Sequence, residues 1–420
     1  MLITEVLKRR TWHETLAEAA GDKNLHLEHL EDLILNNGHD GAISALNYVN
    51  AIRGMLYTGG EAQSKVTVKW DGAPAIICGI DPIDGKFFVG TKAVFGKTEN
   101  KAAKTNADID KWYNEGVGSK LKIALQHLSK IGIKNVLQGD MMFTDDSIEE
   151  KDIGGEAHLT FTPNTITYAV PKDSEIGNKI GRAKIGIVFH TTYTGETLAD
   201  MKADFGASIG GFQESMDVWF DDAYYKDVGG KATLTKQENA VIIDGINKSK
   251  TTLGKVDKER FNSFLTQPDL AKWVKPFINK KITAGQSVGD PTQFVKDFVA
   301  YFKERMDKEI DALKGGPDSP AARKRIERNL QLEQFVGDNL NNLLAVMAVY
   351  KQVIQLKLKL LKKLELIEQN VGTFLKTDKG YRVTNPEGFV AFGIEGGAVK
   401  LNDRLEFNTA NFNVAKNWGK

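Results

Sequence analysis

The stretch that decides the fold runs from Ser64 to Phe95 and reads SKVTVKWDGAPAIICGIDPIDGKFFVGTKAVF. Its first part, SKVTVKW, alternates apolar and polar residues and is rich in β-branched ones, which predicts a strand. APAIICGI and FFVGTKAVF predict two further strands, and DPIDGK between them consists of turn-forming residues. The sequence therefore predicts a strand that ends at Asp71-Gly72, followed by an antiparallel hairpin.

More strands are predicted on the C-terminal side of this hairpin. Residues 107–131 have helical spacing, and the segments KNVLQGDMMF, LTFTPNTITYAV and KIGIVFHTTYTG then predict strands up to about residue 195. Strand patterns return in the last 40 residues, in KGYRVTN, EGFVAFGI and GAVKLND, with RLEFN as a further candidate. We therefore expect an α+β fold with a largely antiparallel sheet.

Helical patterns dominate the rest of the chain. HLEHLEDLILNNG carries leucines at helical spacing and stops at Gly38. Asp290-Pro291 has the form of a helix N-cap and first helical position. The simplest interpretation is one α+β domain with a mostly helical insertion. The expected parts are an N-terminal helical region at 1–60, the first part of the sheet domain at 61–195, the insertion at 196–379, and the last strands at 380–420.

Composition excludes several classes of protein. The 420 residues carry 56 Lys and Arg against 55 Asp and Glu, a net charge of +1, which excludes a globally basic nucleic-acid coat. A single cysteine, Cys78, excludes a disulfide framework and multi-cysteine zinc sites. The N-terminal segment has no signal-peptide pattern, and the apolar runs are too short for a membrane span. We expect a cytoplasmic protein with no membrane partner.

Four short segments at predicted strand edges carry residues suited to chemistry. Lys69-Trp70-Asp71-Gly72 offers an amine that becomes a nucleophile when neutral, and a glycine that allows close approach of a ligand. Gly139-Asp140 and Glu387-Gly388 each place a carboxylate beside an apolar strand, where it is costly unless it binds a cation or a hydroxyl. Lys400 lies on the strand after Glu387 and is suited to neutralise phosphate charge.

In this order, the four segments resemble the motifs of the covalent nucleotidyltransferases, the superfamily of ATP-dependent RNA and DNA ligases and mRNA capping enzymes. The resemblance implies an antiparallel-sheet adenylation domain in residues 61–195 and 380–420. It implies that Lys69 attacks ATP to form a lysyl-AMP intermediate, with Asp71 and Gly72 in the nucleotide site. It also implies a catalytic role for Glu387 and Lys400.

Further roles follow from the same resemblance. Lys92 matches the basic element that contacts ribose or phosphate, and Phe189 matches the aromatic residue that stacks on the base. Asp140 and Glu387 would hold Mg²⁺ or Mn²⁺, and Lys400 would orient the α-phosphate. The implied partners are ATP and a nucleic acid with 5′-phosphate and 3′-hydroxyl ends.

The chain departs from the superfamily pattern in four ways. Asp140 stands where glutamate is usual, Asn402 replaces a second lysine, and about 200 residues separate Phe189 from Glu387. The chain also ends soon after Lys400, without space for a C-terminal OB domain, which favours an RNA ligase over the other members. These departures motivate the alternative of a non-catalytic nucleotide- or nucleic-acid-binding or virion-associated protein that keeps the fold. Transfer of AMP to a protein or small molecule is a third possibility.

The whole chain also resembles uncharacterised proteins of tailed phages. The segments HLEHLEDLILNNG, KWDGAPAI, FFVGTKAVF, LQGDMMF and FHTTYTG carry this likeness, which implies a viral origin and a host-cytoplasmic location. One residue beside the motifs has two interpretations. His190, next to Phe189, either reaches a substrate or is a core histidine with satisfied hydrogen bonds, and the second is the commoner situation.

Overall fold

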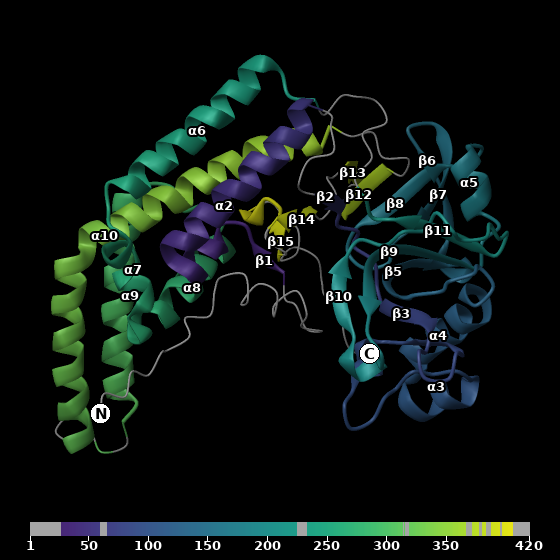
Figure 1. Ribbon diagram of the computed structural model, residues 1–420, viewed down its shortest axis with the longest axis horizontal. Helices are drawn as coiled ribbons and strands as arrows, with labels where there is room; N and C mark the ends of the chain where they lie inside the picture. The colour runs from purple at the N-terminus through teal and green to yellow at the C-terminus, as the bar shows by residue number, and fades with distance from the viewer. Residues whose placement is uncertain are drawn as a thin grey trace, which may run out of the picture. The chain divides into compact units, whose positions relative to one another are not determined.

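The chain folds into two compact units in a computed structural model (Figure 1). The sheet unit comprises residues 1–27, 63–232 and 365–400, and the helical unit comprises 28–62, 233–364 and 401–420. The chain contains both strands and helices, which confirms the expected mixed α+β class. The structure describes residues 27–58, 65–224, 233–313, 315, 319–366, 372–377, 380–383, 388–394 and 397–405.

The largest sheet of the sheet unit has the strand order β10-β9-β5-β3-β4, with β11 alongside β9. Its pairings are antiparallel except that β11 runs parallel to β9. The predicted hairpin is present as β3 and β4, which are joined by the turn at 81–86. The strands are β3 (Ala75–Ile80), β4 (Phe87–Gly90), β5 (Val136–Thr144), β9 (Ile185–Thr194), β10 (Lys202–Phe205) and β11 (Val218–Asp222).

Two helices accompany the apolar core of this sheet. Helices α3 (Asn106–Trp112) and α4 (Glu115–Leu128) begin at the N-cap side chains Thr105 and Asn114, respectively. Leucines of α4 lie in one buried cluster with Ile76, Leu137 and Phe189, because alternate residues of each strand point to the same side. The predicted strand FFVGTKAVF is shorter than expected. It stops at Gly90 and continues as the 3₁₀ turn η1 (Lys92–Phe95).

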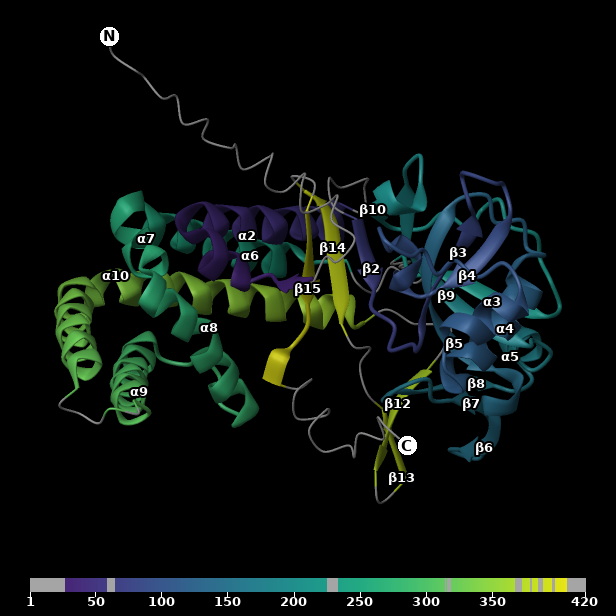
Figure 2. The same cartoon turned by 90° about the horizontal axis from the view of Figure 1, so that it is seen from below.

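Two smaller sheets complete the sheet unit. One has the order β13-β12-β8-β7-β6, and in the other β14 lies between β15 and β2. The antiparallel pair β14 and β2 is visible in Figure 2. The amide of Val68 on β2 also donates to the carbonyl of Ala223, just after β11, at 2.7 Å, which ties β2 to the large sheet. The remaining elements of this unit are β2 (Lys65–Val68), β6 (Glu149–Ile153), β7 (Glu156–Phe161), β8 (Thr167–Pro171), β12 (Gly372–Thr377), β13 (Gly380–Val383), β14 (Phe389–Ile394), β15 (Gly397–Leu401), α5 (Glu175–Ile180), η2 (Asp145–Ser147) and η3 (Leu198–Asp200).

The helical unit is assembled around the 45-residue helix α10, which contacts α2, α6, α7 and α9. Gly38 interrupts α2 with a positive φ of 58°, so the predicted stop is a kink between two helical segments. The side chain of Asp290 caps α9 by accepting from the amide of Gln293, as the sequence predicts. The elements are β1 (Glu28–His29), α2 (Asp32–Thr58), α6 (Lys236–Gly254), α7 (Lys258–Thr266), α8 (Pro268–Thr283), α9 (Pro291–Asp311) and α10 (Pro320–Leu364).

A buried charge cluster joins three segments of the helical unit. Lys357 on α10 donates to both carboxylate oxygens of Glu31 at 2.7 and 2.8 Å, and both side chains are almost completely buried. Arg404 donates to Asp32 at 3.1 Å and to the hydroxyl of Tyr350 at 3.3 Å. Burial by itself raises the pKa of Glu31, but the neighbouring Lys357 ammonium together with His29 and Arg404 holds the pKa below its usual value.

The expected boundaries of the insertion differ from those of the helical unit. The insertion was expected at 196–379, yet the sheet unit extends to 232 and resumes at 365. Strands β10, β11 and β12 lie inside the expected insertion. Strands β10 and β11 both pair with β9, and β12 pairs with β8, which is distant in sequence. In the candidate strand RLEFN, Arg404 and Leu405 are helical and the remaining residues lie outside the described part.

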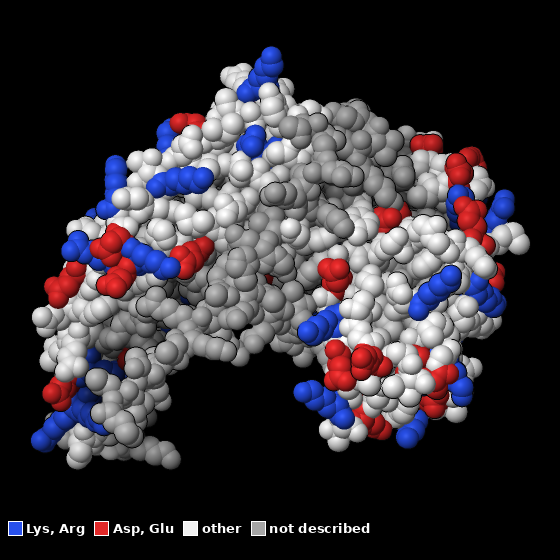
Figure 3. Space-filling model, viewed as in Figure 1, with Lys and Arg blue, Asp and Glu red and all other residues white. Residues whose placement is uncertain are grey.

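The described surface carries charges of both signs. On the face in Figure 3, Lys and Arg side chains alternate with Asp and Glu side chains, in keeping with the near-zero net charge. No helix in the described part of the chain is long and apolar enough to cross a membrane.

Candidate functional site

The segment Lys69 to Gly72 leaves the end of β2 and lies beside the start of β14. The amide of Lys69 donates a 2.8 Å hydrogen bond to the carbonyl of Gly388. Gly388 immediately precedes Phe389, which pairs with Val68 in the antiparallel β14–β2 ladder. The structure therefore brings two of the predicted motifs together. Glu387, the acidic residue of the second motif, lies outside the described residues.

Asp71 anchors the loop that follows Lys69. Its carboxylate accepts from the side chain of Asn164 at 2.6 Å and from the amides of Thr165 and Ile166 at 2.7 and 2.8 Å. Its own amide donates to the hydroxyl of Tyr168 at 2.7 Å. The residue is only 7% exposed, so the protein itself uses the hydrogen-bonding capacity of this carboxylate. In the structure Asp71 shapes the loop, and its contact with a nucleotide stays a prediction.

Gly72 lies directly against the second acidic motif. A Cβ added at Gly72 would stand 2.5 Å from the Cβ of Asp140 and 3.0 Å from the carbonyl oxygen of Met141. The next residue, Ala73, donates its amide to the same Met141 carbonyl at 3.0 Å. The close approach predicted at Gly72 is therefore present, but the group that approaches in the structure is strand β5.

Asp140 is a half-buried carboxylate on the central strand β5. It lies between Ala75 of β3 and Val188 of β9 in the sheet register. Its Oδ1 is 3.6 Å from Nε2 of His190, and the two side chains are 21% and 27% exposed. His190 is therefore not a fully buried core residue. No sequence signal reveals its place beside Asp140, because that place depends on an irregularity in the pairing of β5 and β9.

Phe189 is fully buried, and its stacking on a base stays a prediction that this burial does not favour. The ring has 0% exposure in the core under the large sheet and packs edge-on against Phe212 with a centroid distance of 5.7 Å. A base needs an open aromatic face, and a ring packed on both sides in a core does not present one. Phe189 instead holds β9 on the helical layer.

The two other predicted lysines lie at strand edges. Lys92 is exposed in η1, just after the end of the edge strand β4, where Gly90 pairs with Ile77. Lys400 is half-buried on β15, which neighbours β14. A lysine not assigned from the sequence also reaches this region. Lys120 of α4 directs its Nζ to the carbonyl oxygen of Ala73 at 3.4 Å.

The described residues hold no cluster of three or more His, Cys, Asp or Glu side chains arranged for a metal. Asp140 is nevertheless a fitting partner for Mg²⁺, since this ion is often bound by one or two carboxylates together with substrate phosphates. The partly exposed side chain of Asp140 offers one such carboxylate. The second predicted ligand, Glu387, is not among the described residues.

Two other reactive side chains near the sheet are held in their neutral forms. Burial raises the pKa of the Cys78 thiol well above its usual value, so this cysteine does not supply a thiolate nucleophile. Burial also raises the pKa of Tyr193 to about 12, and its hydroxyl donates to Oε1 of Gln138 at 2.7 Å. Lys69 is therefore a better candidate for a nucleophile in this region than either of them.

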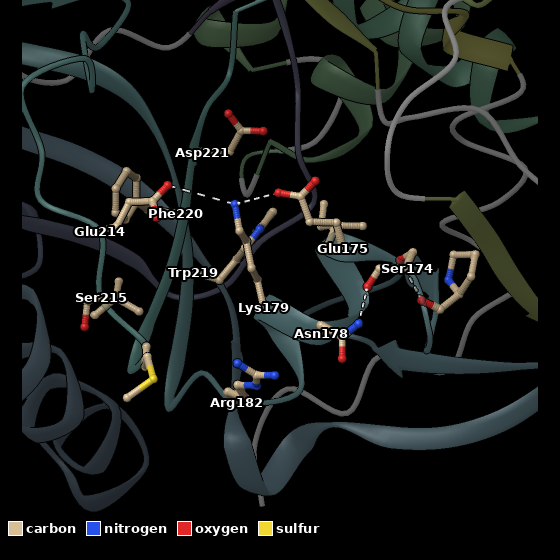
Figure 4. Close-up of a pocket in the computed structure, with 14 residues that line it drawn as sticks. Ser174, Glu175, Asn178, Lys179, Arg182, Glu214, Ser215, Trp219, Phe220 and Asp221 are labelled. Carbon is tan, nitrogen blue, oxygen red and sulfur yellow. Dashed lines mark hydrogen bonds and ion pairs between the residues drawn. The ribbon is translucent and has the colours of Figure 1, made fainter.

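A surface groove beside α5 and β11 contains none of the predicted site residues. Figure 4 shows Lys179 between two carboxylates, at 3.1 Å from Glu175 and 3.9 Å from Glu214. The groove touches the motif region only through Trp219, whose ring lies 6.5 Å from that of Trp70. Its walls carry charges of both signs that already pair with each other. We therefore take the motif cluster, not the groove, as the candidate site.

Comparison with known proteins places the chain in a family. Residues 24–416 match a family of unknown function, DUF6267. The chain belongs to this family. No curated protein and no solved structure matches it. The function of this member of DUF6267 is therefore inferred from its own residues described above.

Proposed function

We propose that this DUF6267 protein is an ATP-dependent, ligase-like nucleotidyltransferase that acts through a lysyl-AMP intermediate on Lys69. One observation carries the proposal. Three segments distant in sequence, at Lys69–Gly72, at Asp140 and at Gly388, converge at the end of β2 through a 2.8 Å hydrogen bond and a glycine contact. Group transfer from a nucleotide requires that groups from separate parts of the chain come together, and the backbone of the lysine segment lies here beside the strand that carries Asp140.

The first chemical step would join Lys69 to the nucleotide. The neutral Nζ attacks the α-phosphorus of ATP, a nitrogen–phosphorus bond forms, and the bond from that phosphorus to the bridging oxygen breaks. Pyrophosphate leaves with the electron pair, and the amine proton passes to water.

The second and third steps would transfer AMP and seal the ends. A 5′-phosphate oxygen of the nucleic acid attacks the lysyl-bound phosphorus, the nitrogen–phosphorus bond breaks, and the Lys69 nitrogen takes a proton from water and leaves as the amine. A 3′-hydroxyl then attacks that 5′-phosphate, loses its proton to water, and displaces AMP with the electron pair of the broken phosphoanhydride bond. Lys400 and Lys92 would contact phosphate or ribose, and Glu387 would act beside Gly388. Mg²⁺ held by Asp140 and Glu387 would offset phosphate charge. RNA is the first acceptor to test.

The experiment is incubation of the full chain with α-labelled ATP and Mg²⁺, followed by a denaturing gel. A labelled band that acid removes and that is absent from Lys69→Ala is the expected result. Lys172→Ala is the matched control, because Lys172 is an exposed lysine of the same unit that pairs with Glu150. Labelling retained in Lys69→Ala would remove Lys69 as the nucleophile.

The second candidate is a non-catalytic nucleotide- or nucleic-acid-binding protein with the same fold. Burial of Phe189 favours it, because a nucleotidyltransferase of the expected type uses an accessible aromatic face at that place. ATP binding by equilibrium dialysis without any covalent label, across several divalent metals and all four nucleotides, would support this candidate over the first.

A further inference from the structure

A β-bulge lies beside Asp140 in the pairing of β5 and β9. Gln138 pairs with Thr191, but the next residue, Gly139, pairs with Phe189, so His190 is the extra residue of β9. Such bulges re-aim one side chain out of the regular alternation and occur preferentially near functional sites. Gly139 is itself required here, because a Cβ at this position would stand 2.8 Å from the carbonyl oxygen of Val188.

The bulge directs His190 to Asp140. Phe189 points into the core, whereas Nε2 of His190 lies 3.6 Å from Oδ1 of Asp140. The side chains of His190 and Asp140 are both partly open to solvent. This separation is within ion-pair range but longer than a hydrogen bond. A movement of a few tenths of an ångström would close it, which is common when a ligand completes a site.

The hydroxyl of Thr191 is the hydrogen-bond partner of the other ring nitrogen of His190. Its Oγ1 lies 2.8 Å from Nδ1 of the imidazole. If the hydroxyl donates to Nδ1, the ring proton resides on Nε2, the nitrogen that faces Asp140. The side-chain contacts then run in one direction, from the Thr191 hydroxyl through the His190 imidazole to the carboxylate of Asp140.

We propose that His190 is a positioning residue that fixes the carboxylate of Asp140 toward the bound nucleotide. The inference rests on the proposed function and adds to it a residue outside the motif set. Asp140 has one methylene fewer than the glutamate usual at this place, so its carboxylate depends more on a neighbour for its orientation. Partners that orient a functional group in this way are typically worth about 10- to 100-fold in ligand affinity or activity.

The test uses the full chain and two substitutions at one position. His190→Ala removes the imidazole, and His190→Gln restores a nitrogen donor near the position of Nε2. We expect His190→Ala to raise the ATP concentration for half-maximal single-turnover labelling by about tenfold, and His190→Gln to recover most of this loss. His158→Ala is the matched control, since His158 lies 3.9 Å from Glu156 in the same unit but outside the site. Thermal melts check that each variant folds.

A second measurement reports on the pair without catalysis. Nitrogen-15 spectra of the imidazoles should show the Nε2-protonated tautomer for His190, and its Nε2 resonance should move in Asp140→Asn. Unchanged labelling in folded His190→Ala, or an Nε2 resonance that ignores Asp140→Asn, would overturn the positioning role while leaving the proposed function standing. A wild-type protein that neither binds nor is labelled by ATP would overturn the function and this inference together.

Discussion

Gly72 and Asp140 lie so close that no side chain fits between them. A Cβ at position 72 would stand 2.5 Å from that of Asp140, which is nearer than side-chain carbons approach in proteins. The loop after Lys69 therefore lies on β5 without an intervening side chain. This contact holds the backbone after Lys69 against the strand that carries Asp140.

Gly72→Ala should accordingly impair the site. The added methyl group must displace either the loop or β5, and we expect a loss of about 1–3 kcal/mol in the free energy of unfolding together with weaker labelling by ATP. Gly54→Ala is the control, because Gly54 lies in α2 with nothing within 4 Å of its Cβ position. Helix propensity predicts that this control is neutral or stabilising by up to about 1 kcal/mol. Urea denaturation measures both, and an equally stable Gly72→Ala would contradict the contact.

Asp71→Asn should destabilise the sheet unit. One carboxylate oxygen accepts from the amides of Thr165 and Ile166, and the other accepts from Asn164. An asparagine must turn its NH₂ group toward one of these donors, at a cost of about 1–3 kcal/mol. Asp173→Asn, at an exposed position of the same unit, is the control. Equal urea midpoints for the two variants would show that the Asp71 network adds little stability.

Substitutions of Phe189 separate a core role from base stacking. Phe189→Ala should cost about 3–5 kcal/mol in stability because it leaves a cavity in the core. Phe189→Leu should retain most of the packing and should bind ATP as the wild type does. If Phe189→Leu kept its melting temperature but bound ATP much more weakly, the ring would contact the nucleotide after all.

The buried pair of Lys357 and Glu31 should give a strongly non-additive double-mutant cycle. Lys357→Met leaves the Glu31 carboxylate without its main partner and should destabilise the helical unit by about 3–5 kcal/mol. Adding Glu31→Gln should recover part of this loss, because the uncompensated charge is removed. Additive effects in urea unfolding would show that the two groups do not interact energetically.

The same pair predicts a dependence of stability on pH. The pKa of Glu31 is lower in the folded protein than in the unfolded chain, since burial, which raises it, is outweighed by Lys357, His29 and Arg404 together. Its stabilising contribution is therefore present above the unfolded-state pKa and is lost as the pH falls through the folded-state pKa. Urea unfolding of wild type and of Glu31→Gln between neutral and acid pH should converge toward low pH. A constant difference would contradict the pKa shift.

Local chemistry in the sequence predicts much of the secondary structure. The alternation in KVTV and the apolar runs AIICGI and FVAFGI predict β2, β3 and β14. The Asp290-Pro291 pair predicts the start of α9, and Gly38 predicts the break in α2. These features depend on residues within a few positions of one another. The ordered set of Lys69, Asp140 and Glu387-Gly388 also follows from the sequence, because each segment has its own strand-edge pattern.

Only the tertiary structure decided which of these residues meet, and in what environment. The three donors around Asp71 come from residues 164–166, the bulge that turns His190 depends on pairing with Gln138 and Gly139, and the burial of Phe189 depends on α4. The short strands β10 and β11 gain their order from β9, not from their own composition. Pairing and burial are long-range properties, so a sequence pattern supplies the candidate groups and the packing of distant strands determines which of them can act.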